Sequence, residues 1–209
     1  MKTIILNASP RKRGNTAEAL QEVKAGAERV GKETEYVDLY DLDFLGCRSC
    51  LQCKRKGAER NRCYWKDDLS PLIERVYREA NALVIGSPVY FGDVTSQFHA
   101  LIERLCFPAL SYDDYSSYFT GKINVGVVLT MNATPKYWDE LYAEKIPDIF
   151  APFRFLNGSV KILKIFDTLQ VKDYSKYNMA AFSEEHKKEV RETQFPQDLR
   201  SAFELGSTL

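Results

Sequence analysis

Residues 3–16 read TIILNASPRKRGNT, in which a short apolar run leads directly into a polar loop rich in basic residues. The apolar run predicts a buried strand over residues 3–8. After the loop, residues 16–30 carry alanine and aliphatic side chains at helical spacing, and Gly31 is suited to end that helix. A strand, a loop and a helix in this order form the first unit of an alternating α/β protein.

The same alternation of strands and helices continues along the rest of the chain. Further strands are expected at 33–39, 82–85, 122–129 and 160–166, and further helices after Asp67/Asp68 and at 95–106, 135–145, 184–192 and 197–205. Right-handed crossovers between such units give a parallel sheet that is covered by helices on both faces. Ligands of these sheets bind at the carboxyl ends of the strands, so the loops after the first, third and fourth strands should carry the function.

The composition is that of a globular domain, with 209 residues of which 44% are hydrophobic. Lys and Arg total 29, as do Asp and Glu, so no net charge favours nucleic acid or an anionic membrane as a partner. No apolar run approaches the roughly 18 residues that span a bilayer, and no signal-peptide pattern is found, so a cytoplasmic location is expected. We expect one domain over 1–209, with a cysteine-rich loop at 47–63 and a C-terminal helical extension at about 178–209.

The first loop combines the features of an anion-binding site. Ser9, Asn15 and Thr16 offer neutral donors, Gly14 permits close backbone approach, and the basic residues 11–13 add positive charge beside a helix N-terminus. The loop lacks the Gly-Lys-Ser/Thr ending of a triphosphate-binding loop and the Gly-x-Gly-x-x-Gly of a dinucleotide-binding turn, which favours a single terminal phosphate. No cysteine has an arginine six positions later, which excludes the loop of a cysteine-based phosphatase. The alternative is an ordinary capped helix with a basic surface turn.

The loop after the third expected strand, residues 86–95, reads GSPVYFGDVT. Its two adjacent aromatic residues, Tyr90 and Phe91, together with Pro88 and Gly92, could place apolar surface and backbone N–H groups against a planar ring. The alternative is a turn whose aromatic side chains fill the core.

Four of the five cysteines lie between residues 47 and 63, whereas Cys106 stands alone in an apolar helical stretch and is expected in the core. Cys47, Cys50 and Cys53, with Cys63 further along, could supply the four thiolates of a [4Fe–4S] centre. The gap between Cys53 and Cys63 holds five basic residues and one acidic residue, a surplus that should lower the pKa of nearby thiols. Zinc, free thiols and a protein-contact loop remain alternatives.

Together these segments resemble the flavodoxin-like NAD(P)H-dependent FMN reductases, and more closely their iron–sulfur flavoprotein branch. The two loop motifs, NASPRKRGNT at 7–16 and SPVYFGDVTSQF at 87–98, carry the resemblance. The cysteine spacing followed by Asp67-Asp68, the segments 167–170 and 173–177, and the C-terminal residues 195–206 also resemble that branch.

The resemblance implies a three-layer flavodoxin-like sandwich with a five-stranded parallel sheet of order 2-1-3-4-5. It also implies FMN as the cofactor and NAD(P)H as a transient hydride donor. The residues implied for the phosphate are Ser9, Arg11, Gly14, Asn15 and Thr16, and those implied for the isoalloxazine ring are Pro88, Val89, Tyr90, Phe91 and Gly92. Thr130-Met131-Asn132 fall where the family lines the ribityl chain or the ring. Because the family usually forms dimers or tetramers, a homodimer or homotetramer is expected.

The function expected on these grounds is that of an FMN-dependent oxidoreductase. Reduced nicotinamide passes a hydride to flavin N5, and the electrons continue to a quinone, another small electrophile, a redox protein or the cysteine-bound cluster. No catalytic side chain is expected, because the flavin carries the chemistry. The alternative is a flavin carrier that docks on a redox partner without turnover of its own; a scaffold with a purely structural flavin has no support in the sequence.

Several other residues are expected to have structural roles. His99 and His186 lack a partner residue recognisable from the sequence, so packing or solvation is expected for both. Trp138 is expected in the core or at an interface, and the polar, aromatic segment 112–118 is interpreted as a lid, a subunit contact or a solvated loop.

Overall fold

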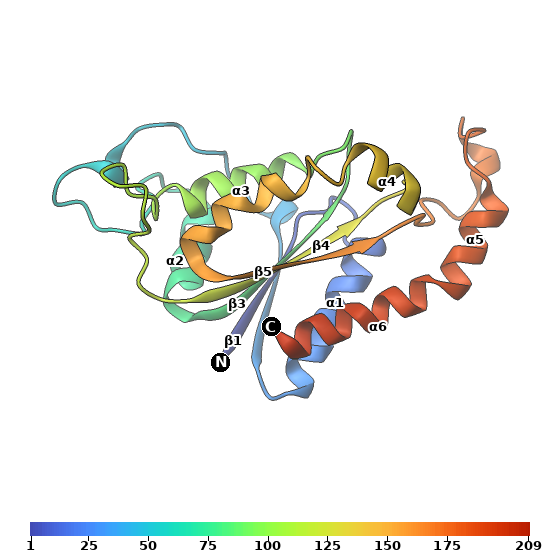
Figure 1. Ribbon diagram of the computed structural model, residues 1–209, viewed down its shortest axis with the longest axis horizontal. Coiled ribbons are helices and arrows are strands. Elements are labelled where there is room, and N and C mark those ends of the chain that lie inside the picture. Colours follow the sequence, from blue (N-terminus) through green and yellow to red (C-terminus); the bar gives the residue numbers. More distant parts are fainter.

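A computed structural model describes residues 1–209 and contains one five-stranded sheet (Figure 1). The strands are β1 (Lys2–Asn7), β2 (Glu33–Asp38), β3 (Ala80–Pro88), β4 (Ile123–Thr130) and β5 (Asn157–Ile165). All neighbouring pairs are parallel, and the order is β2-β1-β3-β4-β5. The predicted fold class and strand order are therefore confirmed. The chain reverses its direction of travel across the sheet between β1 and β3, which places the expected ligand crevice at their carboxyl ends.

Helices cover both faces of this sheet, as the alternation predicts. The helices are α1 (Asn15–Arg29), α2 (Leu69–Glu79), α3 (Ser96–Cys106), α4 (Pro135–Leu141), α5 (Glu184–Thr193) and α6 (Phe195–Thr208). Short 3₁₀ segments occupy Leu39–Asp41, Gln52–Lys54 and Tyr174–Lys176, and a longer one, η3, spans Pro147–Leu156. One core layer joins the sheet to α1 and α6, and the larger layer joins it to α2, α3 and η3.

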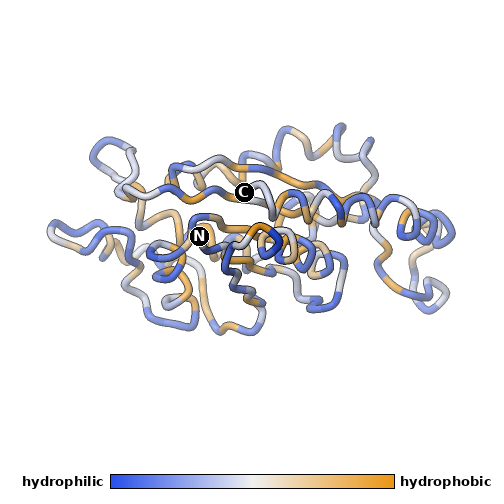
Figure 2. The backbone as a smooth tube through the Cα atoms, turned by 90° about the horizontal axis from the view of Figure 1, so that it is seen from below, coloured by the Kyte–Doolittle hydropathy of each residue, from blue (hydrophilic) through white to orange (hydrophobic).

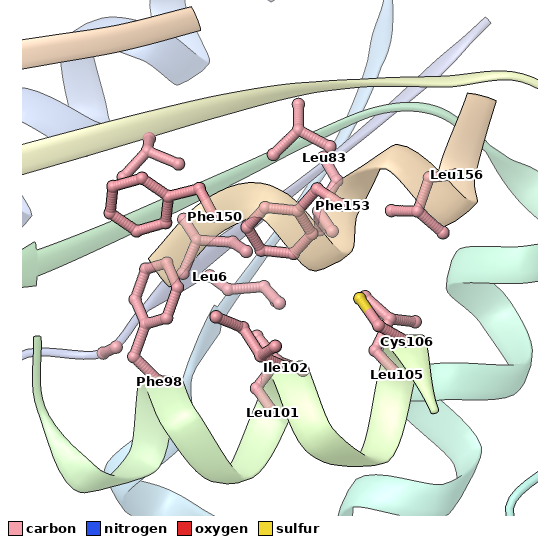
Figure 3. Close-up of a cluster of buried hydrophobic side chains, with 14 of the residues drawn as sticks. Leu6, Leu83, Phe98, Leu101, Ile102, Leu105, Cys106, Phe150, Phe153 and Leu156 are labelled. Carbon is pink, nitrogen blue, oxygen red and sulfur yellow. The ribbon is translucent and has the colours of Figure 1, made fainter. Parts of the chain in front are cut away.

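The larger core layer lies between α3, η3 and the sheet (Figure 3). Phe98 from α3 meets Phe150 and Phe153 of η3 with ring centroids 5.7 and 6.3 Å apart, and all three rings are buried. Cys106, at the end of α3, points its sulfur into the same layer, which confirms its prediction as a core residue (Figure 3). Trp138 is also buried in this core and packs edge-on against Phe166.

The layer on the opposite face depends on a close approach of α1 and α6. A Cβ atom at Gly26 would overlap the carbonyl oxygen of Phe203, and one at Gly206 would overlap that of Val23. Each helix therefore places a glycine against the backbone of the other. This packing fixes the position of α6, from which α5 extends at one end of the molecule (Figure 1).

Several element boundaries differ from the prediction. The segment η3 was not expected, because its Pro152 interrupts regular helix and its four buried residues do not follow one helical stripe. The strand β5 begins at Asn157 rather than at residue 160, and α6 begins at Phe195, with a proline in its first turn. Helix α4 ends at Leu141, four residues before the predicted end.

The distribution of hydropathy follows the layers. Figure 2 shows apolar residues along the central strands and hydrophilic residues on the loops at both ends of the molecule. No helix has both the length and the apolar character that crossing a bilayer requires.

Candidate functional site

The first loop leaves several backbone donors without partners where helix α1 begins. Gly14 is the N-cap residue, with an extended backbone, and no side chain caps the helix. The N–H groups of Asn15, Thr16 and Ala17 form no backbone hydrogen bond. Three free N–H groups at the positive end of a helix dipole form a ready site for an anion.

Three buried hydroxyl groups, of Ser9, Thr16 and Thr130, border these amides. The Oγ of Ser9 accepts a hydrogen bond from the backbone N–H of Arg11 at 3.1 Å, which leaves the hydroxyl hydrogen free to donate. The Oγ1 atoms of Thr16 and Thr130 lie 2.7 Å apart, and one of the two hydroxyls retains a free hydrogen. The Ser9 hydroxyl and one hydroxyl of the Thr16–Thr130 pair can therefore donate to an oxygen held by the helix N-terminus.

The three consecutive basic residues of the loop do not act together. Arg11 and Arg13 line the cleft, and the Arg11 guanidinium donates to the carbonyl oxygen of Gln170 at 2.6 Å. Lys12 instead forms an ion pair with Asp41 outside the cleft. Of the three positive charges that the sequence suggested for the anion site, only those of Arg11 and Arg13 therefore face the cleft.

The loop after β3 forms a tight turn. The backbone groups of Tyr90 and Asp93 exchange hydrogen bonds of 2.8 and 3.0 Å, and Phe91 and Gly92 between them both have positive φ. Two positive φ values at the centre of such a turn are the geometry of a type I′ turn, and Gly92 adopts it without strain. Phe91, at the tip, is fully exposed and Tyr90 is half-exposed. The interpretation that both rings fill the core is therefore wrong.

These loops enclose one cleft of about 540 Å³ at the carboxyl ends of the strands, a volume typical of small-molecule sites. The predicted residues that line it are Ser9, Arg11, Gly14, Asn15, Thr16, Pro88, Val89, Tyr90, Thr130, Met131 and Asn132. Phe91 and Gly92 do not line it, because the turn carries them beyond its wall. The cleft is polar and basic at the α1 end and apolar at the Pro88–Tyr90 end.

A further wall of the cleft was not assigned from the sequence. Residues 168–172, which follow β5, Arg191 of α5 and Glu18 of α1 also line the cleft. The Nδ2 of Asn15 donates to the carbonyl oxygen of Leu169 at 2.9 Å, so this segment is bonded to the first loop. Residues 167–170 carried part of the family resemblance, but only the fold brings them beside α1.

The two histidines and the segment 112–118 lie outside the cleft lining. His99 Nε2 is 2.8 Å from Asp93 Oδ1 at the base of the β3 turn, and His186 lies 3.7 Å from Asp167. The rings of Tyr112 and Tyr118 face Lys54 of the cysteine-rich segment at 5.2 and 5.9 Å. Because segment 112–118 precedes β4, it lies at the amino edge of the sheet, and the interpretation as a lid over the cleft is wrong.

The four clustered cysteines surround one small cavity at the opposite end of α3 from the cleft. Cys63 Sγ accepts a hydrogen bond from the Arg104 Nε at 3.0 Å, and the backbone N–H of Cys47 donates to Glu103 at 2.8 Å. Burial raises the pKa of the Cys53 thiol and outweighs the nearby Lys54 ammonium. The expectation that the basic gap lowers thiol pKa values is therefore wrong for Cys53.

The cavity offers the donors that an iron–sulfur centre needs without presenting a formed metal site. All four thiols line it, and Ser49 and Leu51, on either side of Cys50, hold the left-handed conformation that is uncommon outside glycine. No three Cys, His, Asp or Glu side chains are gathered closely enough to hold a metal ion. The [4Fe–4S] assignment stays a prediction.

Arg104 is the residue that fixes this region. Its side chain is 1% exposed and pairs with the Asp67 carboxylate at 2.6 Å. It also donates to the backbone oxygens of Leu45 and Trp65 at 2.9 and 3.1 Å. In the sequence, Arg104 is one of several charged residues in an amphipathic helix, so no local pattern distinguishes it from a solvent-exposed residue.

The fold and the cleft together define a mononucleotide-binding α/β protein: a 2-1-3-4-5 sheet with an anion site after β1 and an apolar wall after β3. Residues 1–134 match the family model described as NADPH-dependent FMN reductase, and the chain belongs to this family. The family prediction is thereby confirmed.

Among curated proteins, the chain is 36% identical over 104 residues to an iron–sulfur flavoprotein of Methanocaldococcus jannaschii, covering 50% of this chain and 51% of that protein. It is 38% identical over 104 residues to an iron–sulfur flavoprotein of Archaeoglobus fulgidus, covering 50% and 48%. The matched part thus spans about half the length of these relatives.

Among solved structures, the fold is similar to an NAD(P)H:quinone oxidoreductase from Methanothermobacter marburgensis, with a TM-score of 0.73, 19% identity and coverage of 99% of this chain and 96% of that one. It is also similar to an FMN-dependent NADH-azoreductase from Bacillus anthracis in complex with FMN, with a TM-score of 0.63, 16% identity and coverage of 99% and 100%. At these identities the likeness supports the fold.

Proposed function

We propose that this chain is an FMN-dependent oxidoreductase that accepts hydride from NAD(P)H and passes electrons to a small acceptor such as a quinone. The observation that carries the proposal is the two-ended cleft, in which free α1 amides and arginines lie at one end and Pro88–Tyr90 at the other. A phosphate and a planar ring joined by a short polar chain match this order of surfaces. The chain's membership of the FMN reductase family supports the same cofactor.

The residues of the cleft would bind and orient the cofactor. The amides of Asn15, Thr16 and Ala17, with the Ser9 hydroxyl, would hold the phosphate, and Arg11 and Arg13 would neutralise its charge. Pro88, Val89 and Tyr90 would border the ring and limit its contact with water. When bound, FMN supplies the hydride acceptor and the electron donor, so the chain itself needs no catalytic acid or base.

The acceptor is proposed by class. The similarity to the NAD(P)H:quinone oxidoreductase of Methanothermobacter supports a quinone, and the similarity to iron–sulfur flavoproteins supports a cysteine-bound [4Fe–4S] centre. Cys47, Cys50, Cys53 and Cys63 would be the ligands of that centre. Assembly as a homodimer or homotetramer is part of the same proposal.

An anaerobic visible absorption spectrum of the purified protein, loaded with FMN and then mixed with NADPH or NADH, tests this function. The expected result is a flavin band that bleaches with at least one nicotinamide and returns when a quinone is added. A flavin band that neither donor bleaches would contradict the oxidoreductase and favour the alternative, a flavin carrier that is reduced by a protein partner. A protein that takes up no FMN would contradict both.

The phosphate assignment has its own test in the first loop. Arg11→Ala combined with Thr16→Ala should raise the Kd for FMN by about 100-fold, because a charge-assisted hydrogen bond and a neutral one are lost. Lys12→Ala is the matched control, since Lys12 carries the same charge in the same loop but pairs with Asp41. Equal FMN affinity of the double variant and the control would refute the assignment.

A further inference from the structure

Helix α5 borders the cleft through Arg191 and presents two cations on one of its faces. Lys187 and Arg191 are four residues apart, the spacing that places side chains on the same side of a helix. We propose that α5 is a clamp for the cofactor, in which Arg191 is a further phosphate-binding residue and Lys187 positions the loops that line the flavin end. The inference rests on the proposed binding of FMN, and it assigns a role to a helix beyond residues 1–134 of the family match.

Lys187 is a buried cation that joins two loops. Only 4% of its side chain is exposed, and its Nζ lies 2.7 Å from Asp167 Oδ1 and 2.8 Å from the carbonyl oxygen of Asn132. Asp167 is itself buried and has a positive φ of 51°. A buried ammonium group with these two partners holds the loop after β4 and the loop after β5 in one arrangement.

Those two loops are also bonded directly to each other. The N–H of Asp167 donates to the carbonyl oxygen of Ala133 at 3.0 Å, and the N–H and hydroxyl of Thr168 both donate to that of Met131. Met131, Asn132 and Thr168 line the cleft, although Lys187 does not. Lys187 therefore acts on the cofactor through the loops, as a positioning residue.

Arg191 reaches the other end of the cleft, where α1 begins. Its guanidinium donates to Asn15 Oδ1 at 3.2 Å and pairs with Glu18 Oε2 at 2.6 Å. It also lies 4.2 Å from the centre of the Phe195 ring and lines the cleft. The guanidinium thus orients the Asn15 amide and adds a positive charge beside the free α1 amides.

The docking of α5 depends mainly on these polar contacts. Lys187 is the buried residue of the helix, and every other residue of the helix except Val190 is charged or polar, so little apolar surface holds α5 to the sheet. Figure 1 shows α5 at one end of the molecule, beyond the sheet and away from the cysteine-rich loop. Because α5 contacts the loops that would hold FMN, cofactor binding and helix docking should stabilise each other.

The test measures FMN release and the hydrogen exchange of α5 in the full chain. In the unmodified protein, FMN should slow the exchange of the amides of residues 184–193. Lys187→Met and Arg191→Ala should each speed FMN dissociation by about tenfold or more and abolish that slowing. Arg191→Lys should release FMN more slowly than Arg191→Ala, because lysine keeps the positive charge. It should still release FMN faster than the unmodified protein, because it loses the paired contacts of the guanidinium with Asn15 and Glu18.

Two further variants separate the clamp from a general loss of stability. Lys188→Ala, next to Lys187 but exposed and paired with Glu184, should release FMN at the unmodified rate. The double variant Lys187→Met with Asp167→Asn removes both buried charges, so its fold should be more stable than that of Lys187→Met alone. Its FMN release should nevertheless stay fast. The clamp would be overturned if Lys187→Met and Arg191→Ala both released FMN at the unmodified rate. It would also be overturned if FMN did not change the hydrogen exchange of the α5 amides. Failure of the unmodified protein to bind FMN would instead remove the proposed function.

Discussion

The cofactor cleft and the cysteine cavity lie at opposite ends of helix α3 and are built in different ways. At the start of α3, the hydroxyl of Thr95 donates to the carbonyl oxygen of Ala8, which ties the helix to the loop after β1. At its end, Glu103 and Arg104 hold Cys47 and Cys63. The 11 residues of α3 separate the two regions by about 16 Å, at 1.5 Å per residue.

The cleft is assembled by topology, whereas the cavity is assembled by individual side chains. Parallel strands end at one edge, so the loops after β1, β3 and β4 meet there whatever their sequences. The cysteine-rich segment has no such frame, and cations over aromatic rings, such as Arg48 on Trp65 at 3.7 Å and Arg60 on Tyr118 at 4.1 Å, help to hold it. The cavity should therefore be more sensitive to single substitutions than the cleft.

The largest expected effect concerns the content of the cavity. Anaerobic reconstitution with iron and sulfide should load about four iron atoms per chain, and Cys63→Ala should abolish stable loading because one of four ligands is lost. Cys106→Ala is the matched control, because it removes a buried thiol that does not line the cavity. Iron analysis and the visible spectrum provide the measurement. Failure of the unmodified chain to load iron would leave zinc or free thiols as the alternatives.

Arg104→Met should distinguish the two regions by stability. The substitution strands the Asp67 carboxylate, leaves the Leu45 carbonyl without its donor and removes one of the two donors to the Trp65 carbonyl, at a cost of about 3–5 kcal/mol in the free energy of unfolding. Urea denaturation measures this loss, with Arg78→Ala, an exposed substitution on α2, as the control. The folded fraction should still bind FMN with ordinary affinity. A loss of FMN affinity equal to the loss of stability would show that the two regions are not independent.

The smallest expected effect comes from Asp198 in the first turn of α6. Burial raises the pKa of its carboxyl, although Gln194 donates a hydrogen bond to Oδ1, and Oδ2 has no partner. A raised folded pKa means that ionisation destabilises the fold as the pH rises through it. Asp198→Asn should therefore stabilise the protein by about 1 kcal/mol at pH 7. Thermal unfolding should show this gain disappearing below the unfolded pKa of about 4, and a gain that persists there would contradict the explanation.

The alternation of strands and helices, the sheet order implied by the resemblance and the anion-binding first loop followed from the sequence. The alternation and the first loop depend on local pattern, because apolar runs predict strands, helical spacing predicts helices, and a basic Ser/Gly/Asn/Thr loop before a helix predicts free amides. The sheet order came from the family resemblance alone. Ser9, Arg11, residues 13–16 and residues 88–90 line the cleft, whereas Lys12 does not. The boundaries of η3 and β5 were missed because tertiary packing of phenylalanines, rather than local propensity, holds that segment.

Only the tertiary structure decided which side chains of each polar segment face the cleft, which are exposed and which are buried with a partner. It turned Lys12 toward Asp41, carried Phe91 to the tip of a turn, and buried Arg104 and Lys187 among partners 20 to 59 residues away in the chain. Charged residues on amphipathic helices look alike in a sequence, because their partners are distant along the chain and become neighbours only when strands and helices pack. Local pattern therefore determined the layers and the first loop, and long-range contacts determined the clamp and the cysteine cavity.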